Sequence, residues 1–321
     1  MRTLCKLIAV CIAFSLLAGC GNKTTTSTSK ATTLRIALVP KSTSHNFWQT
    51  VRAGAEAAAK EEGAELIFRG PAKETDVAGQ ITIMEDLTNQ KVDAIVMAAC
   101  NSKALIKPVE KAIAAGIPVV TVDSGIDSDI APFIATDNVA GASKGADELA
   151  RIIGDKGNVG VIPIVSGAAT STMREKGFKD QIAKHKSIRV VSTLFSECDE
   201  AKGMSATEDM LTSNPNIVGI FNACGPGAVG SARVLEQRKL AGKVKLVAFD
   251  AFPAEIEALK KGTIQALVVQ NPYKMGYEGV KAAIKAKHGA KVVGMDTGVA
   301  IVTMKNFNDP EIQKLLFPLG R

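Results

Sequence analysis

The feature that most constrains the fold is a unit that repeats along most of the chain. From Leu34 onward, a short apolar run is followed by a segment with helical periodicity and then by a glycine, beginning with 34–39, 47–62 and Gly63. Apolar runs of this length are typical of strands whose two faces are both buried. Strands that alternate with helices throughout predict parallel sheets in an α/β architecture.

The expected elements fall into two groups, which favours two open, doubly wound sheets over the rival topology, a closed barrel. The expected strands span residues 34–39, 64–68, 93–99, 117–123, 133–136, 159–164, 189–195, 217–221 and 244–250. The expected helices span residues 47–62, 77–89, 103–115, 137–153, 171–184, 199–212 and 228–238. A chain of 321 residues is long enough for two domains of about 100–150 residues each.

The N-terminus has the three parts of a secretory signal, which we place at residues 1–19. Arg2 and Lys6 precede a short apolar run, and the sequence LAGC ends at Cys20. LAGC resembles the bacterial lipobox, in which the cysteine becomes the lipidated first residue of the mature protein. The alternative is a plain signal peptide with an incidental cysteine. We expect residues 20–33 to be the lipidated cysteine and a flexible polar tether, so that the protein is anchored to the membrane without spanning it.

Charge and aromatic content argue against nucleic-acid binding. The formal net charge of +7 falls to +5 when residues 1–19 are removed, and the remaining charges are scattered mixtures of both signs. Such a distribution is typical of a solvated surface. Aromatic residues make up only 4% of the chain, which is too few for a platform that stacks single-stranded bases.

The cysteines divide by their position in the chain. Two lie in the expected signal and one is Cys20, which leaves Cys100, Cys198 and Cys224. No CxxC motif or cysteine–histidine cluster is present in the sequence, so we expect no metal site. Export would permit a disulfide, but three cysteines cannot all pair. We therefore expect these three to be small, buried, free cysteines. Whether Cys198 and Cys224 line the functional cleft or pair with each other stays open.

Polar side chains gather directly after the expected strands. In open parallel sheets, ligands bind outside the carboxyl ends of the strands, so these positions are expected to carry function. The candidates are Lys41, His45, Phe47, Trp48, Asp123, Arg174, Asp250 and Gln270. Acids, an amide, an arginine and flat rings suit a polyhydroxylated ligand. The sequence contains no phosphate-binding loop and no nucleophile motif, so we expect neither catalytic residues nor a cofactor.

Six segments then occur in a recognisable order. They are IALVPKSTSHNFWQTVRAGAEAAAKEEG, IPVVTVDS, FIATDN, STMREKGF, VAFD and VVQNPYKMG. Together they resemble the periplasmic sugar-binding proteins of the ribose/galactose type, over residues 34–305. The resemblance implies two lobes joined by three hinge crossings, an N-terminal lobe at 34–136 plus 271–297 and a C-terminal lobe at 137–270 plus 298–321. It also implies that the protein is a monomer outside the cytoplasm. This monomer would capture a sugar or sugar-like solute and deliver it to an ABC permease.

The resemblance implies roles for particular residues. In the family, an aromatic pair after the first strand sandwiches the sugar ring, and Phe47 and Trp48 fill those places here. The family's acids that accept from ligand hydroxyls correspond to Asp123 and Asp250. An alternative for the aromatic pair is packing at the edge of a lobe, and an alternative for the two acids is the capping of loops or helices.

Further correspondences and departures bear on the identity of the ligand. Arg174 corresponds to the family's arginine donor and Gln270 to its hinge glutamine. Lys41 and His45 stand where a small hydroxyl and an asparagine are usual. These changes point away from ribose and leave a larger sugar, a polyol, a furanose or a mildly acidic derivative as candidates.

Other functions remain as alternatives. The same two lobes would serve a sensory receptor that acts through a chemoreceptor or a kinase. An enzyme would need a triad assembled from residues distant in sequence. A transcriptional regulator of this fold would carry a DNA-binding helical domain where this chain has its expected signal and tether.

Overall fold

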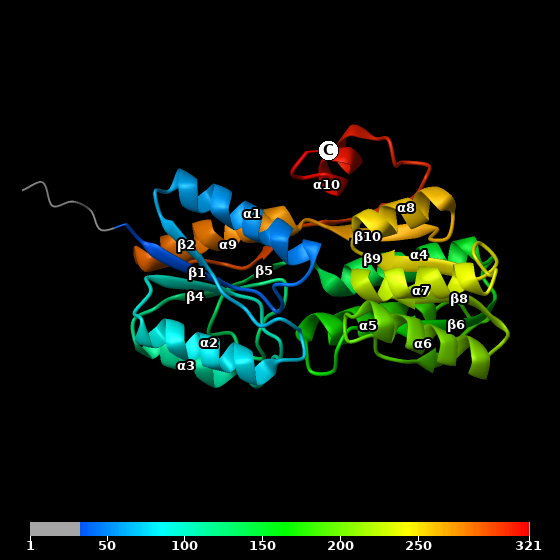
Figure 1. The fold of residues 1–321 in the computed structure, drawn as a ribbon, viewed down its shortest axis with the longest axis horizontal. Helices are drawn as coiled ribbons and strands as arrows, with labels where there is room; N and C mark the ends of the chain where they lie inside the picture. The colour runs from blue at the N-terminus through cyan, green and yellow to red at the C-terminus, as the bar shows by residue number, and fades with distance from the viewer. Residues whose placement is uncertain (1–32, 321) are drawn as a thin grey trace, which may run out of the picture. The chain divides into compact units, whose positions relative to one another are not determined.

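Two six-stranded sheets form the framework of the described chain, which is residues 33–320 of a computed structural model (Figure 1). The first sheet, in the order β11–β5–β4–β3–β1–β2, contains β1 (Arg35–Val39), β2 (Glu65–Phe68), β3 (Ala94–Met97), β4 (Val119–Val122), β5 (Phe133–Ala135) and β11 (Met295–Asp296). The second, in the order β12–β10–β9–β8–β6–β7, contains β6 (Gly157–Ile162), β7 (Ile188–Thr193), β8 (Ile217–Asn222), β9 (Lys245–Phe249), β10 (Ala266–Gln270) and β12 (Val299–Val302). Apart from the edge strands β11 and β12, the second sheet repeats the strand order of the first.

Helices cover both faces of each sheet, and we call each sheet with its helices a lobe. The first lobe contains α1 (Asn46–Glu61), α2 (Val77–Asn89), α3 (Ile106–Ala114) and α9 (Pro272–Lys287). The second contains α4 (Asn138–Ile152), α5 (Ala169–Ile182), α6 (Glu200–Ser213), α7 (Gly225–Gln237), α8 (Pro253–Lys261) and α10 (Pro310–Leu316).

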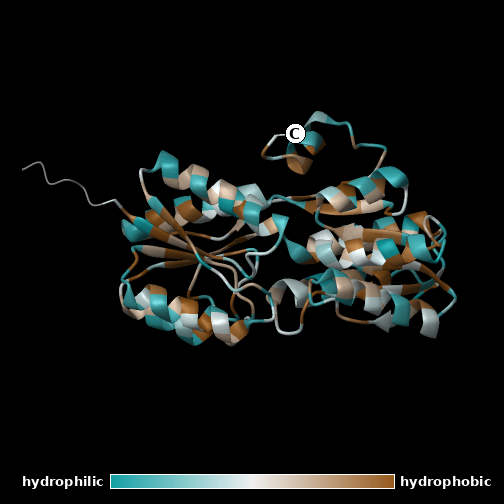
Figure 2. Cartoon of the chain, viewed as in Figure 1, coloured by the Kyte–Doolittle hydropathy of each residue, from teal (hydrophilic) through white to brown (hydrophobic). Residues whose placement is uncertain are grey.

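Strand β1 shows why both faces are covered. Ile36 and Leu38 belong to the hydrophobic cluster that includes α1 and α9, whereas Ala37 and Val39 belong to the cluster that includes α2 and α3. Successive side chains of a strand point to opposite faces, so a strand that is apolar throughout buries both. Figure 2 shows the same division, with apolar strands between helices that carry polar residues.

The structure confirms the expected α/β fold of two doubly wound sheets and excludes the barrel. One strand departs from parallel pairing: β12 is antiparallel to β10, with Gln270 opposite Val299. The path of the chain explains this, because the chain leaves the second lobe at the carboxyl end of β10 and re-enters it at the same end. Helices α8, α9 and α10 have no counterpart among the expected elements.

Three connections join the lobes. The chain passes from β5 to α4 through Thr136, from β10 to α9 through Asn271, and from β11 to β12 through Thr297 and Gly298. The first and third connections are bonded to each other. The Thr136 hydroxyl donates to the carbonyl of Gly298 over 3.2 Å, and the backbone N–H of Thr297 donates to the carbonyl of Ala135 over 2.9 Å. All three connections leave from the carboxyl ends of strands, which places those ends of the two sheets around one region.

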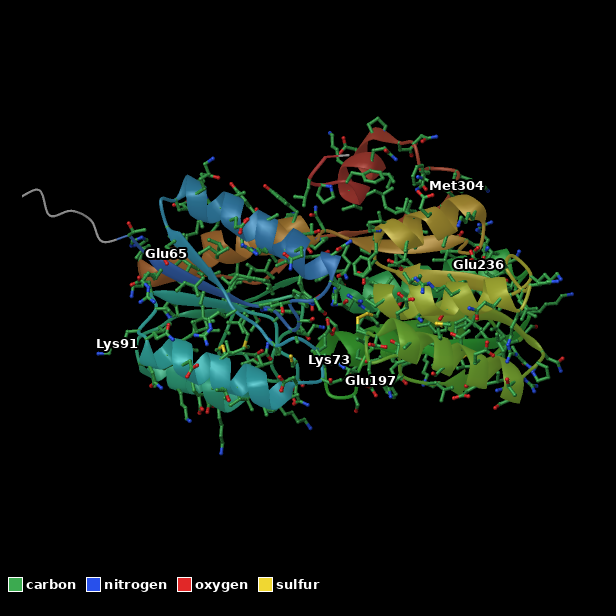
Figure 3. The ribbon with its side chains drawn as sticks, in the orientation of Figure 1. Glu65, Lys73, Lys91, Glu197, Glu236 and Met304 are labelled. Carbon is green, nitrogen blue, oxygen red and sulfur yellow. A yellow bond between two sulfur atoms is a disulfide. The ribbon has the colours of Figure 1, made fainter. Side chains whose placement is uncertain are left out.

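Charged side chains cover the outside of the described chain, as the exposed residues Glu65, Lys91 and Glu236 illustrate in Figure 3. Between residues 33 and 320, no helix has both the length and the apolar character needed to cross a membrane. The expected signal at 1–19, the lipidation of Cys20 and all but the last residue of the expected tether lie outside the described residues.

Candidate functional site

One cavity at the carboxyl ends of the two sheets contains all eight candidate side chains that were predicted from the sequence. Its lining consists of Lys41, His45, Phe47, Trp48, Glu74, Asp123, Ile164, Arg174, Cys198, Cys224, Asp250 and Gln270. Both lobes contribute to this lining. The cavity has a volume of about 20 Å³, which is room for about one water molecule, because the lining side chains pack against one another.

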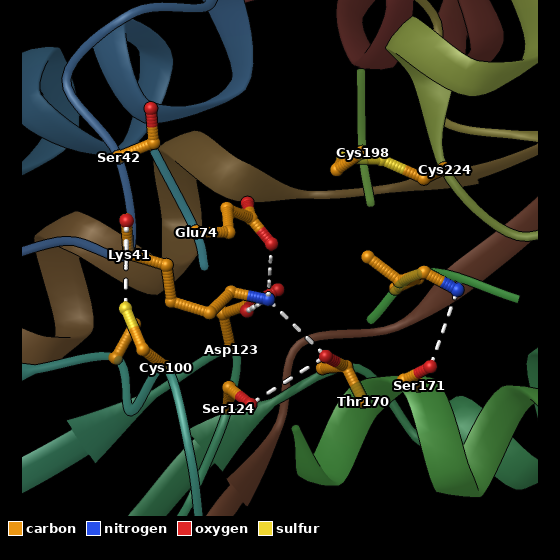
Figure 4. A network of polar contacts seen from close by, with 12 residues as sticks. Lys41, Ser42, Glu74, Cys100, Asp123, Ser124, Thr170, Ser171, Cys198 and Cys224 are labelled. Atoms are coloured by element: carbon orange, nitrogen blue, oxygen red, sulfur yellow. Dashed lines mark hydrogen bonds and ion pairs between the residues drawn. A yellow bond between two sulfur atoms is a disulfide. The ribbon is translucent and has the colours of Figure 1, made fainter. Parts of the chain in front are cut away.

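Lys41 lies at the centre of a charge network in this cavity (Figure 4). Its ammonium nitrogen is 3.2 Å from Glu74 Oε2 and 3.3 Å from Asp123 Oδ2, and it donates to Thr170 Oγ1 over 3.2 Å. Lys41 and Asp123 are each 3% exposed, and Glu74 is 6% exposed. Thr170 lies in the first turn of α5, in the second lobe, whereas the other three belong to the first lobe. The ammonium group therefore bonds the two lobes to each other.

Burial and mutual attraction set the charges of this network. Burial lowers the pKa of Lys41, but the carboxylates of Asp123 and Glu74 outweigh it, so that pKa stands above its ordinary value. Burial raises the pKa of Glu74, but the Lys41 cation and hydrogen bonds from neighbouring side chains bring it well below the usual range. Burial also raises the pKa of Asp123, and the cations of Lys41 and Arg174 limit the rise. Lys41 and Glu74 are therefore both charged at neutral pH.

Asp123 and Asp250 occupy equivalent places in the two lobes. Asp123 follows β4 and Asp250 follows β9, and these strands have the same position in their sheets. Both residues have a left-handed backbone, with φ of 55° and 79°. That conformation costs a non-glycine residue about 1–2 kcal/mol, and such strain is concentrated at functional sites. The Asp250 carboxylate is held by the backbone N–H of Gly225 at 3.1 Å and by Gln270 Nε2 at 2.6 Å.

Arg174 and Gln270 each have a buried polar atom without a partner. Arg174 Nε donates to Asn138 Oδ1 over 2.7 Å, Nη1 donates to the carbonyl of Ala223 over 2.8 Å, and the guanidinium lies 3.9 Å from the ring centre of Phe249. Among the described residues, Arg174 Nη2 and Gln270 Oε1 have no hydrogen-bond partner. An unpaired buried polar atom is costly, so these two atoms suit a ligand that supplies an acceptor and a donor.

Phe47, Trp48 and His45 form the aromatic side of the cavity. The rings of Phe47 and Trp48 meet edge to face, with centres 4.9 Å apart and planes at 85°. They form a corner, and not the two parallel walls of a sandwich that the resemblance implied. The indole N–H of Trp48 donates to Glu74 Oε1 over 3.1 Å. The ring centre of His45 lies 5.6 Å from that of Phe252 in the second lobe.

Glu74 lines the cavity and pairs with Lys41, but it was not predicted from the sequence as a site residue. It lies in the loop between β2 and α2, so it too follows a strand, and the same rule would have drawn attention to it. Strand β2 is at the edge of its sheet, and the loop must turn back for the carboxylate to reach Lys41. That path depends on the folded loop and has no signature in the local sequence.

Cys198 and Cys224 form a disulfide on the wall of the cavity (Figure 4), with Cα atoms 5.7 Å apart. The expectation of free cysteines is therefore wrong for this pair, whereas Cys100 is buried and free. The loop after β7 explains the pairing. Glu197 and Cys198 both have a left-handed backbone, which carries Cys198 to Cys224 at the N-cap of α7. Burial raises the pKa of the Cys100 thiol to about 12, which keeps that thiol protonated.

Thiol counting tests this disulfide. Residues 33–321 contain three cysteines, and we expect one reactive thiol in denaturant before reduction and three after it. Replacing both paired cysteines with serine is expected to lower the free energy of unfolding by about 3 kcal/mol, because the bond joins residues 26 apart and restricts the unfolded chain. Cys100→Ser is the control that leaves the disulfide intact. Three reactive thiols before reduction would contradict the pairing.

The cavity also brings three potential metal-ligand side chains together. His45, Glu74 and Cys198 place ligand atoms within 4.8 Å of one another. The Cys198 sulfur is in the disulfide and supplies no thiolate, and Glu74 is paired with Lys41. The donors that remain are fewer than a zinc site uses, so the arrangement suits a polar organic ligand better than a metal ion.

Comparison with known proteins places this chain in a family. Residues 36–291 match the family model of the periplasmic binding protein domain, and the chain belongs to that family. The D-allose-binding periplasmic protein of Escherichia coli is 32% identical over 280 residues, which are 84% of this chain and 90% of the relative.

Solved structures show the same similarity. A carbohydrate transporter solute-binding protein from Agrobacterium radiobacter, in complex with D-arabinose, has a TM-score of 0.87 and 37% identity, covering 89% of this chain and 99% of that one. An ABC transporter solute-binding protein from Agrobacterium vitis, with bound D-fucose, has a TM-score of 0.85 and 36% identity, covering 88% of this chain and 99% of that one.

Proposed function

We propose that the protein captures a neutral sugar between its two lobes and delivers it to an ABC importer. The observation that carries this proposal is the convergence of polar side chains from both lobes on one cavity, including the unpartnered atoms of Arg174 and Gln270. The similar proteins support the ligand class, since those named above bind allose, arabinose and fucose.

Charge balance favours a neutral ligand over an acidic one. The two permanent cations of the cavity, Lys41 and Arg174, face three acidic side chains, Glu74, Asp123 and Asp250. Lys41 is already bonded to two of these acids, so it is not free to bind a ligand carboxylate. Carboxylates accept strong hydrogen bonds from sugar hydroxyls, and the free Nη2 of Arg174 can donate to a ring or hydroxyl oxygen.

Sugar binding requires the lobes to part. A cavity of about 20 Å³ does not admit a pyranose while Thr170 is bonded to Lys41 over 3.2 Å and lies 3.5 Å from the Ser124 hydroxyl. We infer that the lobes, 34–136 with 271–297 and 137–270 with 298–321, rock about the three connections. A sugar that contacts both lobes then stabilises the closed form by its differential affinity.

We also propose that the protein is exported and works as a monomer held at the membrane by a lipid on Cys20. The LAGC sequence supports the anchor, and the periplasmic relative supports export. Residues 20–33 would then serve as the tether between the anchor and the lobes.

Thermal unfolding with a panel of solutes tests the ligand class. Residues 33–321, which contain both sheets and their hydrophobic clusters, are heated with D-allose, D-ribose, D-arabinose, D-fucose, D-tagatose, ribitol or D-glucuronate. A neutral sugar is expected to raise Tm with concentration, and a ligand at 100 times its Kd stabilises the fold by about 2.7 kcal/mol. A preference for glucuronate, or no shift with any neutral sugar, would contradict the proposal.

A further inference from the structure

A second, larger cavity adjoins the first. It has a volume of about 400 Å³, and Phe47, Asp250 and Gln270 line both cavities. Its other walls come from the start of α1, from α8 and from the C-terminal segment 315–320. Figure 1 shows α10 and the C-terminus above α8. The two cavities are therefore neighbouring compartments with a common wall.

The second cavity differs from the first in chemical character. Apolar side chains dominate its lining, among them Phe252, Ile256 and Leu316. Of its charged side chains, Glu257 and Lys260 form an ion pair of 2.7 Å with each other, and Asp250 lies in the wall shared with the first cavity. A cavity of this size falls within the range that binds small molecules, and this lining suits an apolar group.

The wall between the two cavities is a seam between the lobes. Phe47 belongs to α1 of the first lobe, whereas Asp250 and Gln270 follow and end strands of the second lobe. Asp250 and Gln270 are bonded to each other over 2.6 Å, so they form one side of the seam, and Phe47 forms the other. When the lobes part, the two sides separate, and a ligand that spans both compartments can be enclosed as they close.

We propose that the ligand is a sugar that carries an apolar substituent, such as a glycoside with an aromatic aglycone. The inference rests on the proposed function, because the sugar ring occupies the polar cavity. The substituent passes the seam between Phe47 and the Asp250–Gln270 pair and lies in the apolar cavity. A free monosaccharide would leave this second compartment unused, whereas burial of an apolar substituent there adds affinity.

Calorimetric titration of residues 33–321 with matched glycosides tests the proposal. Each sugar of the panel is compared as the free sugar, the methyl glycoside and the phenyl glycoside, in both anomers. We expect one phenyl glycoside to bind about ten-fold more tightly, or better, than its methyl counterpart, because only the phenyl ring buries substantial apolar surface. Free sugars that bind while no phenyl glycoside gains affinity would overturn this inference and leave the proposed function standing. If neither sugars nor glycosides bind, both are overturned.

A pair of threonine variants locates the substituent. Thr50 in α1 lines the apolar cavity, and its hydroxyl donates to the carbonyl of Asn46, four residues earlier. Thr82 in α2 is exposed and makes the same bond to Ala78. Thr50→Phe is expected to remove the advantage of the phenyl glycoside, whereas the matched control Thr82→Phe keeps it. A phenyl advantage that survives Thr50→Phe unchanged would place the substituent elsewhere and overturn the assignment.

Discussion

Replacing Asp123 with alanine is expected to weaken sugar binding by about 100-fold or more. The carboxylate can accept from two adjacent hydroxyls, and each such charge-assisted bond contributes about 1.5–3 kcal/mol, where 1.4 kcal/mol is a factor of ten in affinity. The fold should survive, because Lys41 keeps its ion pair of 3.2 Å with Glu74. Calorimetric titration with the sugar identified by thermal unfolding measures the loss.

Two further variants make this result interpretable. Asp123 has a φ of 55°, and asparagine tolerates that conformation better than alanine, so Asp123→Asn separates loss of charge from backbone strain. Asp129→Ala, at an exposed position in the same loop, is the control and should bind normally. If Asp123→Ala and Asp123→Asn both keep the native affinity, Asp123 does not contact the ligand.

Replacing Lys41 with methionine is expected to lower the free energy of unfolding at pH 7 by about 3–5 kcal/mol. The change leaves the buried carboxylates of Glu74 and Asp123 without their shared cation, and breaking a buried ion pair from one side has a cost of this size. Lys144→Met, at an exposed position of α4, is the matched control and should change stability little.

The destabilisation caused by Lys41→Met should depend on pH in a defined direction. In the native protein the pKa of Glu74 is lowered, so its contribution to stability is present above its ordinary pKa of about 4.3 and is lost as pH falls. Without Lys41, burial would raise that pKa, so the variant would lose stability as pH rises above the ordinary pKa, toward the raised one. Urea unfolding should therefore show a large difference between the two proteins at pH 7 and a much smaller one at pH 3. An equal difference at both pH values would contradict the charge network.

The fold was predictable because its signals are local. The run at 34–39 became β1 and the run at 217–221 became β8, each within one residue of its expected bounds. The antiparallel pairing of β12 was not predictable in the same way, because it follows from the route of the chain between lobes. A strand's sequence records which faces it buries and not the direction from which the chain arrives.

Most residues of the cavity lining were predictable from the sequence, but their contacts were not. A single rule, that ligands bind at the carboxyl ends of parallel strands, nominated residues as distant as Lys41 and Gln270, and the structure brings them to one cavity. One of the two acidic partners of Lys41, Glu74, was missed, because the loop that carries it starts at the edge of the sheet. The pairing of Cys198 with Cys224 was not predicted either, because it depends on a left-handed loop backbone.

The fluorescence of Trp48 during titration with sugar reports whether the ligand enters the cavity between the lobes. Trp48 is the only tryptophan of the chain, and its indole bonds to Glu74, which is paired with Lys41. A sugar that enters between the lobes must disturb this network. We therefore predict a saturable change in Trp48 fluorescence, with the same midpoint as the calorimetric titration. A sugar that raises Tm but leaves Trp48 fluorescence unchanged would contradict the account, because the ligand would then bind outside this cavity.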